Sequence, residues 1–392
     1  MNNIEELLER GVANIIPNKN VLLGKLRAGK KLNIYLGIDP TSTKIHLGHT
    51  VPLRKLQKFA ESGHNVTFLI GDFTALIGDT SDKDSERPAL TIKEIKENFK
   101  TYKKQAEKIL DFSKIKIEYN SKWLNKLTFE DILKLTQHFS VGDFVGRQLI
   151  KKRLNENKRV GLHELLYPVM QGYDSYMLDT DLQIGGTDQT FNMQAGRTLI
   201  KDLKNKESFI LTTTILEGTD GRKMSKSWGN AIWLDDNPND MYAKIMSVFD
   251  NLIIKYFTLV TDISLETISD YEKKLKKENP INIKKELAFE IVKELHNLKS
   301  AKDAQKEFEK RVQNKEIPEN ISYIYTNSKH INILDALYLS GFATSISNAK
   351  RLIKQKGVFV DDILIEKNDD KIDVSHERVL RVGRRFKKIK MK

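Results

Sequence analysis

The chain contains no cysteine among its 392 residues. This absence excludes disulfide bonds, thiolate nucleophiles and zinc sites that depend on cysteine. Among the eight histidines, only His46 and His49 are spaced like a ligand pair, and no third ligand lies at a matching spacing. We therefore expect no metal ion held by protein side chains alone.

Long apolar segments are also lacking. No apolar run approaches the ~18 residues that a membrane-spanning helix requires. The first residues, 1–8, are acidic and amphipathic, whereas a secretory signal begins with basic residues and continues with apolar ones. We expect a cytoplasmic protein with no membrane association.

Basic residues exceed acidic ones, and the formal net charge is +13. Positive charge favours a polyanionic partner, because lysine and arginine release counterions from phosphate backbones. A generally lysine-rich composition would give the same total, so the distribution of charge is more informative. Residues 331–392 contain 14 lysines or arginines against 8 acidic residues, a net +6 that concentrates nearly half of the excess in one short segment.

The order of predicted elements indicates the fold of the first half. Residues 1–30 are expected to form short helices. From residue 33 onward apolar strands alternate with helices, and this β-α-β order predicts an α/β domain with a doubly wound, Rossmann-like parallel sheet. The expected strands are 33–38, 66–70, 115–119, 181–186 and 209–216, and the expected helices are 92–110, 162–176 and an insertion at about 120–165.

The pattern changes after residue 235. Helical periodicity without strands, followed by a linker that includes the Ser/Asn/Tyr stretch after residue 320, predicts a helical domain over 236–325. The last segment, 331–392, predicts a small α+β domain with helices at 333–340 and 345–355, a hairpin at 357–362 and a basic tail. A chain of this length suits such a division into two or three domains.

The first of two chemically informative motifs is His46-Leu47-Gly48-His49, which follows the strand 33–38 and opens a helix. In an α/β fold such a helix N-terminus offers unpaired N–H groups and a favourable dipole to a phosphate. Gly48 leaves room for a nucleotide ring against the backbone, and two imidazoles can donate hydrogen bonds. The motif by itself could mark any nucleotidyltransferase of this superfamily.

The second motif, Lys223-Met224-Ser225-Lys226-Ser227, follows the turn-rich stretch 218–221, which suits a mobile loop. Its lysines carry compact positive charge, as a pyrophosphate leaving group requires. A solvated lysine loop is the alternative interpretation of this run taken alone. Together, the two motifs indicate a site that holds ATP from two sides.

The two motifs, in this order, resemble the signatures of class I aminoacyl-tRNA synthetases. Further stretches narrow the resemblance to the bacterial-type tyrosyl-tRNA synthetases: LGIDPT at 36–41, GDFTALIGD at 71–79, YPVMQGYD at 167–174 and QIGGTDQ at 183–189. The resemblance is nearly continuous from about residue 30 to 235 and returns at the C-terminus. It implies a catalytic domain at 1–235 and a helical domain on the anticodon side at 236–325.

The resemblance implies that the carboxylate of tyrosine attacks the α-phosphate of ATP and that tyrosine is then transferred to the terminal adenosine of tRNA. Such a reaction needs positioning and charge stabilisation instead of a protein nucleophile. The catalytic residues that it implies are His46, His49, Lys83, Arg87, Lys223 and Lys226. The ATP site would also include Asp39, Thr41, Gly48, Asp188 and Ser225. ATP is a substrate accompanied by Mg²⁺, and no tightly bound cofactor is implied.

The tyrosine-binding residues implied by the resemblance are Tyr35, Asp79, Tyr167, Gln171, Asp174 and Gln189. Three of them, Tyr167, Gln171 and Asp174, recur at i, i+4 and i+7 of one predicted helix, which places them on one face and supports a shared pocket. Asp174 and Tyr35 match the partners of the substrate phenol, whose hydrogen bonds would separate tyrosine from phenylalanine. For Tyr35, ordinary packing within its strand is the alternative.

The C-terminal segment resembles a small RNA-binding module found in a ribosomal small-subunit protein, through residues 347–353 and 356–358. We expect RNA contacts from its basic residues: Lys350, Arg351, Lys354, Arg381, Arg384 and Arg385. The family resemblance adds tRNA(Tyr) as a partner and a homodimer, for which the insertion at 120–165 is the expected interface.

Three other functions remain to be separated from this one. The related tryptophan enzyme shares both motifs but lacks a C-terminal RNA module of this type and needs no carboxylate at Asp174. A small-molecule nucleotidyltransferase would leave the helical and basic C-terminal part without a purpose. A non-catalytic RNA-binding protein would not need intact His46, His49, Lys223 and Lys226.

Overall fold

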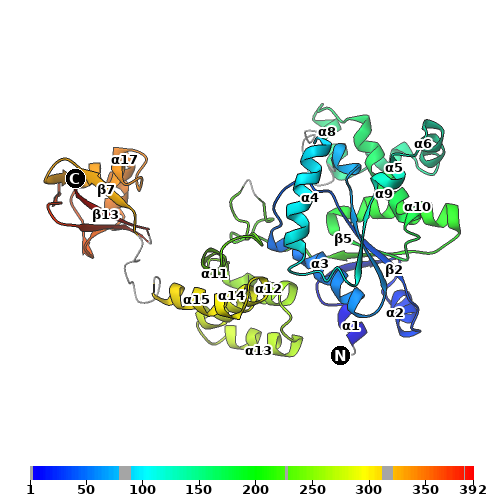
Figure 1. The fold of residues 1–392 in the computed structure, drawn as a ribbon, viewed down its shortest axis with the longest axis horizontal. Helices are drawn as coiled ribbons and strands as arrows, with labels where there is room; N and C mark the ends of the chain where they lie inside the picture. Colours follow the sequence, from blue (N-terminus) through cyan, green and yellow to red (C-terminus); the bar gives the residue numbers. More distant parts are fainter. Residues whose placement is uncertain (1–2, 79–89, 226–227, 311–320, 384) are drawn as a thin grey trace. The chain divides into compact units, whose positions relative to one another are not determined.

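The computed structural model describes residues 3–78, 90–225, 228–310, 321–383 and 385–392. Its internal contacts divide the chain into two compact units, Met1–Ala304 and Gln305–Lys392 (Figure 1).

The first unit is built around a six-stranded sheet in the order β1-β6-β5-β2-β3-β4. Neighbouring strands pair in parallel throughout, except that β1 pairs antiparallel with β6. This confirms the predicted α/β class with a mostly parallel sheet. The strands are β1 (Val12–Ile16), β2 (Asn33–Ile38), β3 (Asn65–Ile70), β4 (Ile115–Tyr119), β5 (Leu182–Gly186) and β6 (Phe209–Thr213).

Strand β1 was not predicted. Short helices do occur on either side of it, as α1 (Asn3–Leu7) and α2 (Lys19–Arg27), but Val12–Ile16 pairs with β6 at the edge of the sheet. The pairing partner lies far away in the chain, and a bulge between Val12 and Asn14 interrupts the register. Because both features depend on tertiary structure, local periodicity in residues 1–30 could not reveal this strand.

The inner strands are almost wholly apolar because helices cover both faces of a parallel sheet. All five residues of β6 are buried. Helix α3 packs on β2, β3 and β5, while α10 packs on β5, β6 and α9. The principal helices are α3 (Leu47–Glu61), α4 (Ile92–Ala106), α9 (Leu162–Met177) and α10 (Thr190–Lys204), and the predicted insertion contains α5 (Ser121–Leu124), α6 (Phe129–Thr136), α7 (Val141–Val145) and α8 (Gln148–Asn155).

The strand order reverses next to β2. Strands β3 and β4 follow on one side of β2, whereas the chain then crosses to β5 and β6 on the other side. In open α/β sheets, ligands bind at the carboxyl ends of the strands at such a reversal. We therefore expect a ligand-binding site at the loops that follow Ile38 in β2 and Gly186 in β5.

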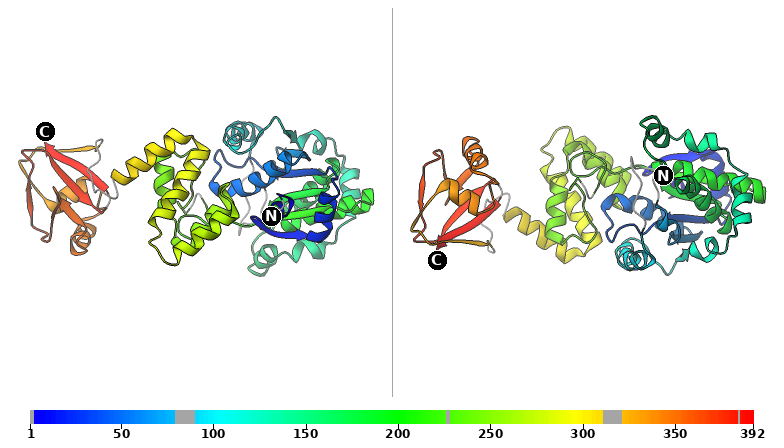
Figure 2. Two further views of the ribbon diagram at one scale, coloured as in Figure 1. Left: turned by 90° about the horizontal axis from the view of Figure 1, so that it is seen from below. Right: turned by 90° about the horizontal axis from the view of Figure 1, so that it is seen from above.

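Residues 239–310 contain helices and no strand, as the sequence predicted. The helices form one group, shown in green and yellow in Figure 2: α11 (Pro238–Met246), α12 (Ile253–Val260), α13 (Leu265–Leu275), α14 (Ile281–Leu295) and α15 (Leu298–Phe308). Arg54 of α3 donates to the carbonyl of Val260 at 2.9 Å, and the Tyr256 hydroxyl donates to the carbonyl of Glu217 at 2.7 Å. These bonds join α12 to the α/β part of the unit.

The second unit has a five-stranded sheet in the order β10-β9-β12-β13-β7, beside a two-stranded pair, β8 and β11. The residues expected to form a linker after residue 320 include strand β7, which pairs in parallel with β13, so the linker prediction is wrong for Tyr323–Thr326. The elements are β7 (Tyr323–Thr326), β8 (His330–Asn332), α16 (Ile333–Leu339), α17 (Ile346–Lys354), β9 (Val358–Val360), β10 (Ile363–Leu364), β11 (Lys371–Asp373), β12 (Arg378–Val382) and β13 (Arg385–Met391).

A buried ion pair fixes the predicted insertion to helix α9. Arg153 of α8 donates through both terminal nitrogens to Glu164 of α9, at 2.6 and 3.0 Å. Glu164 also accepts the backbone N–H of Gly161 at 2.8 Å. The side chains are 2% and 0% exposed, so water cannot replace either partner.

Replacing Glu164 with alanine should destabilise the first unit by about 3–5 kcal/mol, because the Arg153 guanidinium stays buried without its carboxylate. The matched control is Glu130→Ala, which breaks the i,i+4 pair with Lys134, whose side chains are 65% and 75% exposed. That change should cost at most about 0.5 kcal/mol. Urea denaturation followed by circular dichroism measures both, and equal midpoints for the two variants would contradict the assignment.

Candidate active site

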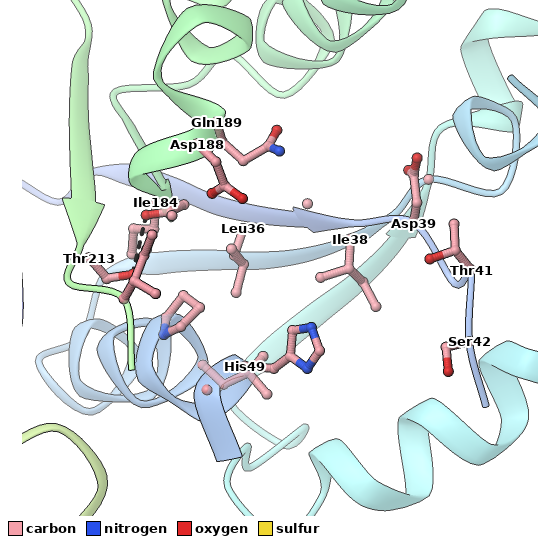
Figure 3. A pocket seen from close by; sticks show the side chains of 18 of the residues that line it. Leu36, Ile38, Asp39, Thr41, Ser42, His49, Ile184, Asp188, Gln189 and Thr213 are labelled. Atoms are coloured by element: carbon pink, nitrogen blue, oxygen red, sulfur yellow. Dashed lines mark hydrogen bonds between the residues drawn. The ribbon is translucent and has the colours of Figure 1, made fainter. Parts of the chain in front are cut away.

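The carboxyl ends of β2 and β5 open into a cavity of about 640 Å³. Figure 3 shows Asp188 and Gln189, which follow β5, on one side of the strands and His49 of α3 on the other. Every predicted catalytic, ATP-binding or tyrosine-binding residue that the structure describes lines this cavity: Tyr35, Asp39, Thr41, His46, Gly48, His49, Tyr167, Gln171, Asp174, Asp188, Gln189, Lys223 and Ser225. Asp79, Lys83, Arg87 and Lys226 lie outside the described residues.

The two histidines of the first motif form a stacked pair at the N-terminus of α3. Their ring centroids are 3.7 Å apart with an interplanar angle of 22°, and the His46 backbone N–H donates to His49 Nδ1 at 3.2 Å. Burial, followed by the nearby charges of His49 and Lys223, lowers the pKa of His46 to about 2. The His46 imidazole is therefore neutral at physiological pH and can donate from only one nitrogen.

Gly48 makes room for the ring of His46. A Cβ at this position would lie 3.1 Å from His46 Nδ1 and 3.2 Å from Cε1. From the sequence we expected this space to accommodate a nucleotide ring. In the structure, the missing side chain lets the imidazole of His46 lie against the first turn of α3.

The two motifs are joined by backbone pairing. The N–H of Leu47 donates to the carbonyl of Ile232 at 2.8 Å, and the N–H of Leu234 donates to the carbonyl of Ile45 at 2.9 Å. His46 lies opposite Trp233 in this short ladder. The chain that leaves the lysine loop is thus fixed directly beside the N-terminus of α3.

Asn230, which is 3% exposed, organises the lysine loop from within. Its amide nitrogen donates to Asp220 Oδ1 at 2.7 Å and to the carbonyl of Lys223 at 3.2 Å, and its amide oxygen accepts the N–H of Ser225 at 2.9 Å. A Cβ on Gly218 would lie only 2.5 Å from Asn230. Asn230 was not predicted from the sequence, because an asparagine beyond a glycine-rich turn has no distinguishing pattern.

Lys223 reaches across the cavity. Its Nζ lies 3.3 Å from Asp188 Oδ2, so the second motif contacts the loop that follows β5. Both side chains are partly exposed, so this ion pair contributes little to stability. The contact instead shows that the ammonium group can reach the space between the two motifs.

Asp174 is the most deeply buried acid of the cavity, at 3% exposure. Trp123 Nε1 donates to one carboxylate oxygen at 2.7 Å, and Asn120 Nδ2 donates to the other at 3.2 Å. Burial raises the pKa of Asp174 to about 8, aided by the negative charges of Asp39 and Asp72 and opposed by these two hydrogen bonds. Asn120 and Trp123 were missed in the sequence, where they follow β4 without a motif.

A chain of hydrogen bonds continues from Asp174 to the carboxylate of Asp39. Asn120 also donates to Thr74 Oγ1 at 3.0 Å, and Thr74 donates to Asp39 Oδ1 at 2.8 Å. The hydroxyl of Tyr167 donates to the other oxygen of Asp39 at 2.9 Å. Asp39 therefore accepts from two hydroxyl groups on separate elements, which orients its carboxylate at the end of β2.

Tyr35 lines the cavity, but its hydroxyl is used by the protein itself. It lies 2.8 Å from Ser175 Oγ and donates to Gln183 Oε1 at 3.2 Å. Burial raises the pKa of Tyr35 well above its usual range, so the phenol stays protonated. The described contacts thus give Tyr35 a packing role in strand β2, while the ring remains part of the cavity wall.

The predicted RNA-binding residues lie in the second unit. Lys350, Arg351 and Lys354 are exposed on α17. The guanidinium of Arg381 lies 3.8 Å from the ring centre of Phe359, and that of Arg385 lies 4.9 Å from the ring centre of Phe342. Arg384 lies outside the described residues.

Comparison with known proteins agrees with this geometry. The family of class I tRNA synthetases for tryptophan and tyrosine matches residues 27–313. A tyrosine–tRNA ligase of Thermotoga maritima is 43% identical over 383 residues, which cover 97% of this chain and 95% of that protein. A tyrosine–tRNA ligase of Photobacterium profundum is 41% identical over the whole of both chains.

A solved structure has the same fold. A C-terminally truncated mitochondrial tyrosyl-tRNA synthetase of Aspergillus nidulans superposes with a TM-score of 0.67 at 24% identity, covering 79% of this chain and 93% of that one. The chain belongs to the class I tRNA synthetases for tryptophan and tyrosine. Within this family, the relatives described above carry the name of the tyrosine enzyme.

The raised pKa of Asp174 predicts a pH dependence of stability. Between the ordinary pKa of 3.8 and about 8, the folded protein keeps a proton on Asp174 that the unfolded chain releases, so stability falls as pH rises through this window. Asp174→Asn removes the titration. The stability of this variant relative to the parent should therefore increase by about 1.4 kcal/mol for each pH unit within the window.

Thermal denaturation of both proteins across a pH series measures this difference. The control is Asp270→Asn. The hydrogen bond to Lys273 lowers the pKa of Asp270, so the carboxyl of Asp270 does not titrate within the same window. A constant difference between Asp174→Asn and the parent from pH 5 to 8 would contradict the raised pKa.

Proposed function

We propose that this chain is a tyrosine–tRNA ligase that converts tyrosine and ATP to tyrosyl-adenylate and pyrophosphate and then transfers tyrosine to the 3′-terminal adenosine of tRNA(Tyr). The observation that carries the proposal is the single cavity at the ends of β2 and β5. It combines both ATP-signature motifs with a buried carboxylate on the face of α9. The names of the close relatives support the choice of tyrosine over tryptophan.

The ATP half of the site uses the N-terminus of α3 and the lysine loop. The neutral imidazole of His46 and the ring of His49 can donate to phosphate oxygens at the N-terminus of α3, whose helix dipole favours an anion. Lys223 can leave Asp188 to meet the departing pyrophosphate, and we assign the same task to Lys226, Lys83 and Arg87. Because charge develops during pyrophosphate departure, these cations act mainly in the transition state.

We assign the nucleoside of ATP to the loops after β2 and β5, with Asp39, Thr41 and Gly48 on one side and Asp188 and Gln189 on the other. Mg²⁺ would neutralise charge on the phosphates, which supply oxygen ligands of the kind that this ion prefers. Carboxylates of Asp39 and Asp188 line the same cavity and suit a water-mediated contact with such an ion.

The tyrosine half of the site uses the buried face of α9. The side-chain oxygens of Tyr167, Gln171 and Asp79 would accept hydrogen bonds from the ammonium group of the substrate. Asp174 would form a hydrogen bond with the phenol, as an acceptor when it is ionised and as a donor when it is protonated. Trp123 and Asn120 already hold both of its oxygens, so its position is set before substrate arrives. A phenylalanine ring could not make this additional hydrogen bond to the buried Asp174, which accounts for rejection of that amino acid.

The second unit would bind tRNA. Its exposed Lys350, Arg351 and Lys354 on α17 are free to contact phosphates, while Arg381 and Arg385 present guanidinium groups stacked on aromatic rings. We assign residues 1–235 to catalysis and the helices α11 to α15 to the anticodon side of the tRNA. A cytoplasmic location follows from the use of tRNA in protein synthesis.

A homodimer is part of the proposal. Large apolar side chains are exposed on the insertion and at the start of α9: Phe129 is 76% exposed, Val141 73%, Leu162 74% and Leu133 51%. Contiguous patches of exposed apolar residues mark interaction surfaces, and we propose that these side chains contribute to one. A second copy of the chain would cover them, and sedimentation analysis of Val141→Glu should then show dissociation towards monomers.

Pyrophosphate exchange tests the substrate. The parent should exchange with tyrosine and reject phenylalanine and tryptophan. Asp174→Ala should lower kcat/KM for tyrosine by roughly a hundredfold, the loss expected for a bond to a buried carboxylate whose other donors are also left unpaired. Asp181→Ala is the matched control, because Asp181 is similarly buried at 6% exposure but does not line the cavity.

Tyrosine exchange that is unchanged in Asp174→Ala would show that the phenol binds elsewhere. Faster exchange with tryptophan than with tyrosine in the parent would overturn the proposed substrate.

Truncation separates activation from RNA binding. Since β7 pairs with β13, the deletion must begin before β7, and removing residues 321–392 takes away both sheets of the second unit. The shortened chain should retain tyrosine-dependent exchange, because Trp233 is the last residue in the sequence that lines the cavity. Aminoacylation of tRNA should fall by at least tenfold, and the salt dependence of tRNA binding should weaken because phosphate contacts are lost. Full aminoacylation by the shortened chain would contradict a role for the second unit in binding tRNA.

A further inference from the structure

The sheet of the second unit has two chemically different faces. In the register of β7 and β13, Ile324 pairs with Ile389, and both pack with the apolar side chains of α16 and α17. Alternate residues of a strand point to opposite faces. Tyr323 and Tyr325 on β7, with Lys388 and Lys390 opposite them on β13, therefore occupy the other face.

The two tyrosines form a stacked pair that is open to solvent. Their ring centroids are 5.9 Å apart with an interplanar angle of 19°, and the residues are 41% and 54% exposed. Lys390 Nζ lies 4.9 Å from the ring centre of Tyr323 and 5.7 Å from that of Tyr325. Two parallel rings with a cation beside them offer both a stacking surface and an attraction for phosphate.

The arrangement is held in place by its neighbours. The hydroxyl of Tyr323 donates to Glu377 Oε2 at 2.7 Å, and Lys388 pairs with the other oxygen of Glu377 at 2.7 Å. Lys388 Nζ also lies 5.5 Å from the ring centre of Tyr323. The carboxylate of Glu377 thus orients the ring of Tyr323. The ring of Tyr325 can stack on Tyr323 without a hydrogen bond from its own hydroxyl.

Aromatic and basic side chains continue across the same face. Arg381 pairs with Phe386 of β13 and with Phe359 of β9, so all three point the same way as Lys388. The guanidinium of Arg381 lies over the ring of Phe359 at 3.8 Å. Sheet faces on which aromatic rings alternate with cations bind single-stranded nucleic acid by stacking, and the cations follow the backbone.

A purely protective role explains these residues less well. Charged residues beside a sheet edge prevent pairing with another sheet, and Lys388 and Lys390 lie on β13, next to the edge strand β7. That task needs charge but no exposed aromatic rings. Two tyrosines stacked at the surface expose apolar area that a protective edge would avoid.

We propose that Tyr323, Tyr325, Lys388 and Lys390 form a stacking platform that binds an unpaired base of tRNA and its adjoining phosphates. The proposal rests on the proposed tRNA ligase function and adds to it a sheet face distinct from the basic helix α17. A base inserted against Tyr325 would extend the existing stack, while Lys390 turns from the rings to the phosphate.

The test uses the full-length protein and measures the affinity for a tRNA(Tyr) transcript by fluorescence anisotropy across a salt series. Tyr325→Ala should weaken binding roughly tenfold to a hundredfold, the effect of losing one base–aromatic stack, without changing the salt slope. Tyr325→Phe should bind like the parent because it keeps the ring. Lys390→Ala should reduce the salt slope by about one phosphate contact.

Tyr338 supplies the matched control. It is also 54% exposed in the second unit but lies on helix α16, away from the platform strands. Tyr338→Ala should leave the affinity unchanged. A blunt RNA duplex without unpaired bases should bind the parent and Tyr325→Ala equally, and tyrosine activation should be the same in all these proteins.

Equal affinity of the parent and Tyr325→Ala for tRNA would overturn the platform, and so would equal losses in Tyr325→Ala and Tyr338→Ala. Loss of affinity in Tyr325→Phe would overturn stacking as its basis. If Tyr325→Ala binds normally while deletion of 321–392 abolishes charging, RNA binding by the second unit stands and only the platform fails. If the deletion has no effect on charging, the proposed role of the second unit fails as well.

Discussion

The short backbone ladder between Ile45–Leu47 and Ile232–Leu234 is the constraint on which the ATP half of the site depends. It brings residues that are remote in sequence to the N-terminus of α3. At the other end of the lysine loop, Lys255 and Tyr256 of α12 bind the side chain and the carbonyl of Glu217. The loop is therefore fixed at both ends, and Asn230 shapes the segment between them. Lys223 in this anchored loop is close enough to His46 to act on the charge of its imidazole.

The tyrosine half depends on a different kind of constraint, the satisfaction of buried polar groups. The carboxylate of Asp174 is almost inaccessible to water, and its two oxygens instead accept hydrogen bonds from Trp123 and Asn120. Asn120 has its amide oxygen on the N–H of Phe73 and its nitrogen on Thr74, and Thr74 holds Asp39. A partly satisfied network of this kind would be costly, whereas a complete one fixes each member. Substrate then meets groups whose positions are already set, which is the condition for electrostatic selectivity.

A feature could be predicted from the sequence when neighbouring residues determine it, and could not when it depends on residues that are distant in the chain. Regular patterns predicted the strands β2–β6 and helix α9, because continuous apolar runs and a 3.6-residue period are local properties. Resemblance supplied the cavity residues, and the structure places all the described ones together. Strands β1, β7, β8 and β11 escaped prediction, since each is short and is defined by a distant partner. The residues expected to form a basic tail instead contain strands β12 and β13. Asn120, Trp123 and Asn230 escaped for a similar reason: their importance lies in the buried atoms that they contact, and a single asparagine or tryptophan has no sequence pattern.

The two units solve recognition by opposite means. In the first unit, polar groups are buried and paired before ligand binds, so a single missing hydroxyl on the substrate leaves an uncompensated group. In the second unit, Lys350, Lys354 and the rings of Tyr323 and Tyr325 are exposed, so each RNA contact that we propose there would displace only counterions and loosely held water. Selectivity among amino acids can therefore be steep and insensitive to salt, while affinity for tRNA must come from many weak contacts that salt diminishes. A surface of this second kind gains most from stacking rings, because the attraction between a base and an aromatic face does not depend on ionic strength.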